Sequence, residues 1–184
     1  ADINGEVAYS SLMRAIQHVK EGHAELLVTA PVSKKALELA KVPFTGHTPL
    51  LEHHFPLEPI SMAFHSEPLK VILATIHIPL LEVKKQLMET LLPTIQNAFL
   101  FAEQLKIENP KIAIAGLNPH ASEGGQFGTF EQEFMEPLLA ECRNQGLFIA
   151  GPISPDVVFR QAMDNAYDIV IALYHDQGLI PVKC

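Results

Sequence analysis

The stretch "KIAIAGLNPHASEGG", residues 111–125, joins a short apolar run to a loop of small and polar residues. The apolar run is typical of a buried β-strand. Asn118, Pro119 and the two final glycines favour a turn over a continuing strand. We therefore expect His120 to lie just beyond the carboxyl end of a strand, which is where ligands bind in open α/β sheets.

Predicted strands and helices alternate along the rest of the chain. Residues 60–64 and 69–76 are expected to pair as a hairpin, and the residues leading to Lys183 are predicted to form a last strand. The other predicted strands are 25–30, 111–116, 147–150 and 167–174. Helices are predicted at 8–19, 33–40, from 48 onward, 80–88, 90–105, 129–146 and 155–161. This order predicts a layered α/β/α fold with a mostly parallel, mixed sheet.

Proline and capping residues predict several helix boundaries. Thr48 followed by Pro49 indicates a helix start, with the Thr48 hydroxyl as N-cap and the proline in the first turn. Pro93 is compatible with the first turn of a helix that begins near Thr90. Pro137 falls inside a predicted helix and should kink it.

Composition excludes several classes of protein. The 184 residues are 48% hydrophobic and 18% charged, which suits a globular protein with one substantial core. A net charge of −8 argues against nucleic acid or an anionic membrane as the main partner. The most apolar stretch, residues 69–83, contains Lys70 and His77 and is too short to span a bilayer. Cys142 and Cys184 lie far apart and form no C-x-x-C pair, so we expect a reduced, cytoplasmic protein. No basic segment followed by an apolar one opens the sequence, so we expect no secretion signal.

Three of the nine histidines each follow a predicted strand: His77, His120 and His175. If these strands are parallel neighbours, the three imidazoles converge on one edge of the sheet. Three imidazoles can hold a divalent metal ion and leave coordination positions open for water or substrate. Position alone is equally compatible with three separate histidines that form hydrogen bonds at strand ends.

Two further motifs carry candidate site residues. "HDQG" places Asp176 beside His175, where its carboxylate could orient the imidazole or transfer a proton. "TGHT" places His47, the Thr48 hydroxyl and free backbone amides at a predicted helix start, a common phosphate site. An ordinary capped turn is the alternative. The glycine-rich loop matches neither common nucleotide-binding motif, G-x-G-x-x-G or G-x-x-x-x-G-K-[ST].

Taken together, "TAPVSK", "PFTGHT", "TIHIPL", "GLNPHASEGGQFGT", "GPISPD" and "YHDQGLIPVK" resemble the 4-hydroxythreonine-4-phosphate dehydrogenase family of pyridoxal phosphate biosynthesis. The motifs occur in the family's order, and the chain resembles roughly the middle half of a family member. The resemblance implies NAD-dependent, divalent-metal-dependent oxidation of 4-(phosphooxy)-L-threonine. The 3-oxo acid product would then lose carbon dioxide to give 3-amino-2-oxopropyl phosphate.

The resemblance also implies roles for individual residues. His77, His120 and His175 match the family's metal ligands, one of them contributed across a homodimer interface. His47, Thr48 and Lys183 match its contacts to the phosphorylated substrate. No residue of this stretch is assigned to NAD. The implied fold is similar to isocitrate and isopropylmalate dehydrogenases, with 1–35 in a first, cofactor-side domain and 36–184 in a second, metal-binding and dimerisation domain.

Chemistry adds catalytic candidates and leaves alternatives open. Asp176 and Lys183 are the catalytic candidates, and Lys183 could also anchor the phosphate. Asp156 suits either a supporting carboxylate or a helix start, and Lys34 is a weaker phosphate candidate. Three imidazoles suit Zn²⁺ or Co²⁺, whereas a carboxylate-assisted site could take Mg²⁺. The alternatives are a sister dehydrogenase of phosphoerythronate or phosphothreonate, and a metal-binding dimerisation fragment without catalysis.

Overall fold

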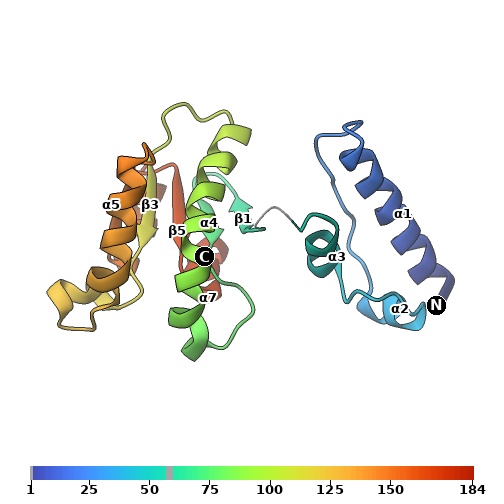
Figure 1. Ribbon diagram of the computed structural model, residues 1–184, viewed down its shortest axis with the longest axis horizontal. Coiled ribbons are helices and arrows are strands. Elements are labelled where there is room, and N and C mark those ends of the chain that lie inside the picture. Colours follow the sequence, from blue (N-terminus) through green and yellow to red (C-terminus); the bar gives the residue numbers. More distant parts are fainter. Residues whose placement is uncertain (1, 57–59) are drawn as a thin grey trace. The chain divides into compact units, whose positions relative to one another are not determined.

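The computed structural model describes residues 2–56 and 60–184 and divides into two compact units, Ala1–Glu58 and Pro59–Cys184 (Figure 1). The boundary between these units falls later in the chain than the domain boundary predicted after residue 35. A compact unit is defined by contacts within this chain, whereas that prediction concerned the domains of a longer family member. The predicted division at 35 therefore stays a prediction.

The N-terminal unit is helical in its described part. It contains α1 (Asp2–Lys20), α2 (Lys34–Leu39) and α3 (His47–His54). Helices α1 and α2 meet closely at Gly5, where an added Cβ would lie 2.1 Å from the carbonyl oxygen of Ala36. The Ser33 hydroxyl caps α2 by accepting a hydrogen bond from the Ala36 amide.

Two predictions for this unit are wrong. Residues 25–30 form an extended segment instead of a strand, with Leu26 77% and Val28 83% exposed. An apolar run forms a strand only when a neighbour accepts its backbone hydrogen bonds, and the single sheet among the described residues lies in the other unit. Helix α3 begins at His47 with Gly46 as N-cap, so Thr48 is its second residue and caps nothing.

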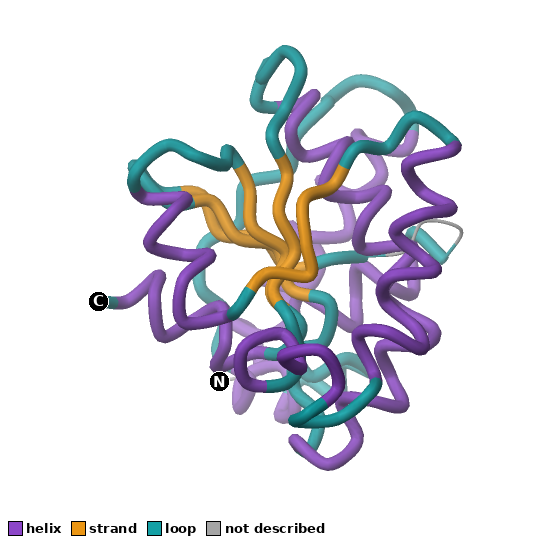
Figure 2. The backbone as a smooth tube through the Cα atoms, turned by 90° about the vertical axis from the view of Figure 1, so that its left-hand side faces the viewer, coloured by secondary structure: helices purple, strands orange, loops and turns teal. Residues whose placement is uncertain are grey.

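The C-terminal unit is built around a five-stranded sheet in the order β1-β2-β5-β3-β4. Strands β1 and β2 form the predicted antiparallel hairpin, and β2, β5, β3 and β4 run parallel. The mostly parallel, mixed sheet is thus confirmed, and its twist is visible in Figure 2. The strands are β1 (Met62–His65), β2 (Lys70–Leu73), β3 (Ile112–Ala115), β4 (Ile149–Ile153) and β5 (Ile169–Ala172).

Alternating side chains of β5 separate two buried cores. Ile169 and Ile171 pack with residues of α4 and α5, whereas Val170 and Ala172 pack with residues of α6 and α7. Helices therefore cover both faces of the sheet, as an α/β/α fold requires. The helices are α4 (Val83–Gln104), α5 (Glu136–Asn144), α6 (Pro155–Met163) and α7 (His175–Lys183). Shorter turns are Leu80–Glu82, Pro119–Gly125 and the π-helical Glu131–Met135.

One helix prediction for this unit is also wrong, and another is confirmed. The predicted helices 80–88 and 90–105 are one helix, α4, which continues through Pro93. A proline in a helix interior costs about 3 kcal/mol, and the apolar face of α4 that includes Leu87, Leu91 and Ile95 offsets this cost by burial. Pro137 lies inside an unbroken helical stretch, residues 130–144, directly after its π-helical part Glu131–Met135, so the predicted position of this proline within a helix is confirmed.

The predicted strand at Lys183 is the helix α7. This helix packs so closely on the sheet that a Cβ on Gly178 would lie 2.4 Å from the Leu73 side chain. Burial of Leu179 on this face favours the helix over a further strand. No helix in the described part of the chain is both long and apolar enough to cross a membrane.

Candidate metal and substrate site

The carboxyl ends of β2, β5 and β3 lie side by side because these strands are adjacent and parallel. His77 and His175 follow β2 and β5, and their ring centroids are 5.4 Å apart. Both rings line a cavity of about 340 Å³ together with Tyr174 and Asp176. The structure thus brings together two of the three histidines predicted to bind metal.

Two buried polar side chains tie these strand ends to one another. The Thr75 hydroxyl, beyond β2, donates a 2.8 Å hydrogen bond to the carbonyl of Leu173, beyond β5. Gln177 accepts a 2.6 Å bond from the Leu173 amide and donates a 2.8 Å bond to the carbonyl of Gly116, beyond β3. The segments that lead to the three histidines therefore share a network centred on Leu173. The sequence analysis did not identify either residue. Thr75 lies within an apolar run and Gln177 within the "HDQG" motif, and both positions could have drawn attention to them.

The predicted neighbour of His175 is in contact with it. Asp176 Oδ1 lies 2.8 Å from His175 Nδ1. With the proton on Nδ1, His175 donates to Asp176 and keeps Nε2 free as a ligand atom. The histidine side chain is 35% exposed and the aspartate 75%, so the pair borders solvent. This arrangement can present a neutral imidazole to a metal ion.

His120 does not complete a three-histidine cluster with His77 and His175 in the described part of the single chain. Among the described residues, His77, His120 and His175 do not bring their ligand atoms within 4.8 Å of one another. The His120 ring lies 6.1 Å from that of Phe127. The three-histidine metal site therefore stays a prediction.

Asp156, in the first turn of α6, is a carboxylate near His120. The Ser154 hydroxyl donates a hydrogen bond to Asp156 and lowers the pKa of that carboxyl below its usual value. The charge of His120 lowers this pKa further. Asp156 is thus an ionised group on the His120 side of the sheet edge.

The predicted phosphate turn opens α3 in the N-terminal unit. His47 and Thr48 are its first two residues, so free amides of a helix start surround them. His47 also lines a cavity of about 230 Å³ formed with α1 and the extended segment that includes Val28. Its buried Nε2 atom has no hydrogen-bond partner among the described residues. His47 Nε2 can therefore form a hydrogen bond to a ligand.

The two lysines predicted as phosphate anchors lie on helices. Lys34 is the first residue of α2, in the N-terminal unit. Lys183 is an exposed residue in the last turn of α7, in the C-terminal unit. The roles of Lys183 in substrate binding and catalysis stay predictions, because the structure contains no substrate.

A second candidate metal site lies near the end of α1. The ligand atoms of His18, Glu21 and His23 lie within 4.8 Å of one another, and all three residues are exposed. His23 Nδ1 is 3.2 Å from Glu21 Oε2. Side chains this exposed lose much rotamer freedom when they bind an ion, which disfavours tight binding.

Comparison with known proteins gives consistent matches over the whole chain. The family model of the pyridoxal phosphate biosynthetic protein PdxA matches residues 1–184. The 4-hydroxythreonine-4-phosphate dehydrogenase of Beijerinckia indica is 38% identical over 182 residues, which are 98% of this chain and 54% of that protein. The D-threonate 4-phosphate dehydrogenase of Salmonella typhimurium is 38% identical over 180 residues, 97% of this chain and 55% of that protein.

Solved structures agree with these sequence matches. The crystal structure of 4-hydroxythreonine-4-phosphate dehydrogenase from Klebsiella pneumoniae superimposes with a TM-score of 0.86 at 38% identity. The match covers 97% of this chain and 54% of that one. The chain therefore spans about half the length of the relatives that it matches.

Proposed function

Because this chain belongs to the family of the pyridoxal phosphate biosynthetic protein PdxA, we propose that it works in an NAD- and divalent-metal-dependent dehydrogenase. The proposed substrate is 4-(phosphooxy)-L-threonine, which is oxidised to a 3-oxo acid. That acid then decarboxylates to 3-amino-2-oxopropyl phosphate. Curated relatives named for this activity support the proposal.

The observation that carries the metal dependence is the pair of imidazoles at the ends of adjacent parallel strands. We propose His77, His120 and His175 as ligands of Zn²⁺, Co²⁺ or Mg²⁺. The donor set fits, since neutral imidazoles favour Zn²⁺ and Co²⁺ and nearby carboxylates would favour Mg²⁺. When bound, such an ion lowers the pKa of a substrate hydroxyl and stabilises negative charge on its oxygen. Asp176 holds His175 in the tautomer that leaves Nε2 free.

The position of His120 supports a site shared between two subunits. Among the described residues of one chain, His77 and His175 have neighbouring rings, but the ligand atoms of all three histidines do not lie within 4.8 Å of one another. A ligand set completed by the second copy in a homodimer would account for this separation. The active site would then exist only in the dimer.

We propose His47 and Thr48 at the start of α3, and independently Lys183, as contacts of the substrate phosphate. The free amides at His47 and Thr48 and the unpartnered His47 Nε2 suit an anion. Lys183 adds a positive charge for the phosphate and, with Asp176, is a candidate for proton transfer. Both cysteines are free, which agrees with a reducing, cytoplasmic location.

A second candidate function has equal support from sequence identity. The D-threonate 4-phosphate dehydrogenase of Salmonella typhimurium matches as well as the hydroxythreonine enzymes do. Its substrate carries a hydroxyl where 4-(phosphooxy)-L-threonine carries an amine. Formation of NADH with each substrate separates the two functions. Turnover of neither, with metal binding intact, would instead favour a non-catalytic metal-binding module.

Metal titration by calorimetry tests the site directly. The titration is done in a His18→Ala, His23→Ala background, so that the exposed cluster on α1 does not compete. Replacement of His77 or His175 by alanine should weaken Zn²⁺ binding by at least ~10-fold, the loss that even supporting groups of metal sites produce. His65→Ala is the control, because His65 lies in the hairpin strand β1 away from the cavity lining. Unchanged affinity in both site variants would refute the proposed metal centre.

A further inference from the structure

The loop that carries His120 has an unusual backbone. Residues His120, Ala121, Ser122 and Glu123 have φ angles of 52°, 49°, 71° and 42°, and Gly124 follows at 68°. Left-handed conformations are unfavourable for non-glycine residues because the Cβ crowds the following carbonyl oxygen. A run of them persists only where the surrounding structure imposes it.

A single buried side chain accepts four hydrogen bonds from this loop. Glu131, which is 0% exposed, accepts hydrogen bonds at Oε1 from the amides of Leu117 and Asn118, at 2.8 and 2.7 Å. Its Oε2 accepts a 2.8 Å bond from Asn118 Nδ2 and a bond from the Ser122 hydroxyl. An ionised carboxylate is an acceptor at both oxygens and therefore matches four donors.

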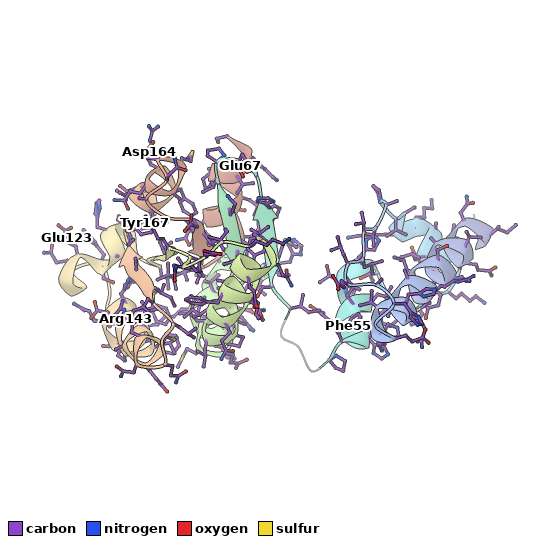
Figure 3. The ribbon with its side chains drawn as sticks, turned by 90° about the horizontal axis from the view of Figure 1, so that it is seen from above. Phe55, Glu67, Glu123, Arg143, Asp164 and Tyr167 are labelled. Carbon is purple, nitrogen blue, oxygen red and sulfur yellow. The ribbon has the colours of Figure 1, made fainter. Side chains whose placement is uncertain are left out.

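The loop donors also explain how a carboxylate is tolerated in the interior. No ion pair to Glu131 is recorded in the part of the chain that the structure describes. Burial raises the pKa of Glu131, but the hydrogen bonds from Asn118 and Ser122 outweigh it, so the pKa lies below its usual value. Glu123, which belongs to the loop itself, is exposed and points outward (Figure 3). Of these two acidic residues, Glu131 is therefore the one that holds the loop from the interior, whereas Glu123 faces solvent.

The turn that follows β3 is shaped for this arrangement. Gly116 lies so close to the returning loop that an added Cβ would be 2.8 Å from the Ala121 Cα. Glu131 is the first residue of the π-helical turn that leads into α5. Its side chain therefore connects the start of that helix to both sides of His120, through Asn118 and Ser122.

We propose that Glu131 is a positioning residue for His120: its buried carboxylate holds Leu117, Asn118 and Ser122 in place, and thereby the left-handed run 120–124 that fixes where the imidazole lies. The effect on metal binding rests on the proposed function, whereas the effect on loop conformation does not. Glutamine at this position keeps the shape and can accept from the Leu117 and Asn118 amides. Its amide nitrogen cannot accept from Asn118 Nδ2, so part of the loop is released.

The test is NMR of the full chain labelled with ¹⁵N, with the His120 imidazole signal assigned from a His120→Gln variant. Glu131→Gln should shift the signals of His120 and of the 117–122 amides, and leave those of His77 and His175 unchanged. Glu133→Gln is the matched control, since it removes the same charge from an exposed residue of the same turn. This control should leave the imidazole signals of His77, His120 and His175 unchanged.

Two further measurements keep the outcomes distinct. If Glu131→Gln does not fold, Ser122→Ala removes one loop donor and should shift the same signals. Zn²⁺ affinity should fall at least ~10-fold in the folded variant. Unchanged His120 signals in the folded variant would overturn the proposal. Wild-type protein that binds none of Zn²⁺, Co²⁺ and Mg²⁺ at the strand edge would refute the proposed function, while the NMR result would still decide the role of Glu131.

Discussion

The two compact units bury apolar side chains in different ways. In the N-terminal unit, the described buried hydrophobic residues are Ile16, Leu37 and Leu50, one from each helix. In the C-terminal unit, a sheet separates two cores, and strands such as β5 are buried throughout. Because burial of apolar area supplies most of the free energy of folding, the C-terminal unit should be the more stable of the two.

The polar groups show the same contrast. At the sheet edge, the side chains of Thr75 and Gln177 are buried with their hydrogen bonds made. In the N-terminal unit, His47 and His54 each have a buried Nε2 atom without a partner among the described residues. The sheet edge therefore holds its polar side chains in place without a ligand, whereas in the proposed phosphate site His47 Nε2 would gain its partner only from the ligand.

The largest expected effect comes from the core of the C-terminal unit. Leu87→Ala removes a side chain that is 0% exposed and should lower the free energy of unfolding by about 2–5 kcal/mol. Leu50→Ala, at an equally buried position of the N-terminal unit, should reduce hydrogen-exchange protection in α1, α2 and α3 alone. Denaturant unfolding and hydrogen exchange measure both. Equal loss of protection in β5 from the two variants would show that the units unfold together.

A smaller effect is expected at the sheet edge. Gln177→Leu leaves the Leu173 amide and the Gly116 carbonyl without their partner, at a cost of about 1–3 kcal/mol for an unsatisfied buried group. It should also weaken Zn²⁺ binding, because the strand ends that carry the histidines lose their connection. Gln145→Leu, at an exposed position of the same unit, should change stability by no more than about 0.5 kcal/mol. If Gln177→Leu and Gln145→Leu have the same free energy of unfolding, the hydrogen bonds of Gln177 do not stabilise the carboxyl edge of the sheet.

The smallest effect is a pH dependence confined to the N-terminal unit. Burial lowers the pKa of His54 from 6.5, and the charges of Lys20 and His53 lower it further. The unfolded chain therefore binds this proton more readily than the folded one. The contribution of His54 to stability is complete above pH 6.5 and is lost as the pH falls from there through the folded-state pKa.

Hydrogen exchange at neutral and mildly acidic pH checks this expectation. Protection in α3 should fall on acidification, while protection in β5 should not respond to this group. A His54→Gln variant should lose the pH response in α3. A response that persists unchanged in that variant would assign it to another group.

The sequence by itself determined the elements whose signals are local. The five strands of the sheet were predicted from short apolar runs, and the β1–β2 hairpin from the turn between them. The positions of His77, His120 and His175 beyond three of these strands followed from sequence order. The edge of the sheet at which to look for a ligand site followed from the rule that ligands bind beyond the carboxyl ends of parallel strands.

Only the tertiary structure decided the features that depend on distant partners. Residues 25–30 have strand-like composition but lack a pairing strand in the described chain, and α7 is a helix because Gly178 and Leu179 pack on the sheet. Gln177 reaches a carbonyl 61 residues away, and Glu131 reaches amides 13 and 14 residues away. A sequence pattern can single out such a residue but cannot name its partner, because a buried carboxylate or amide is stabilised by donors and acceptors that only the folded chain brings to it.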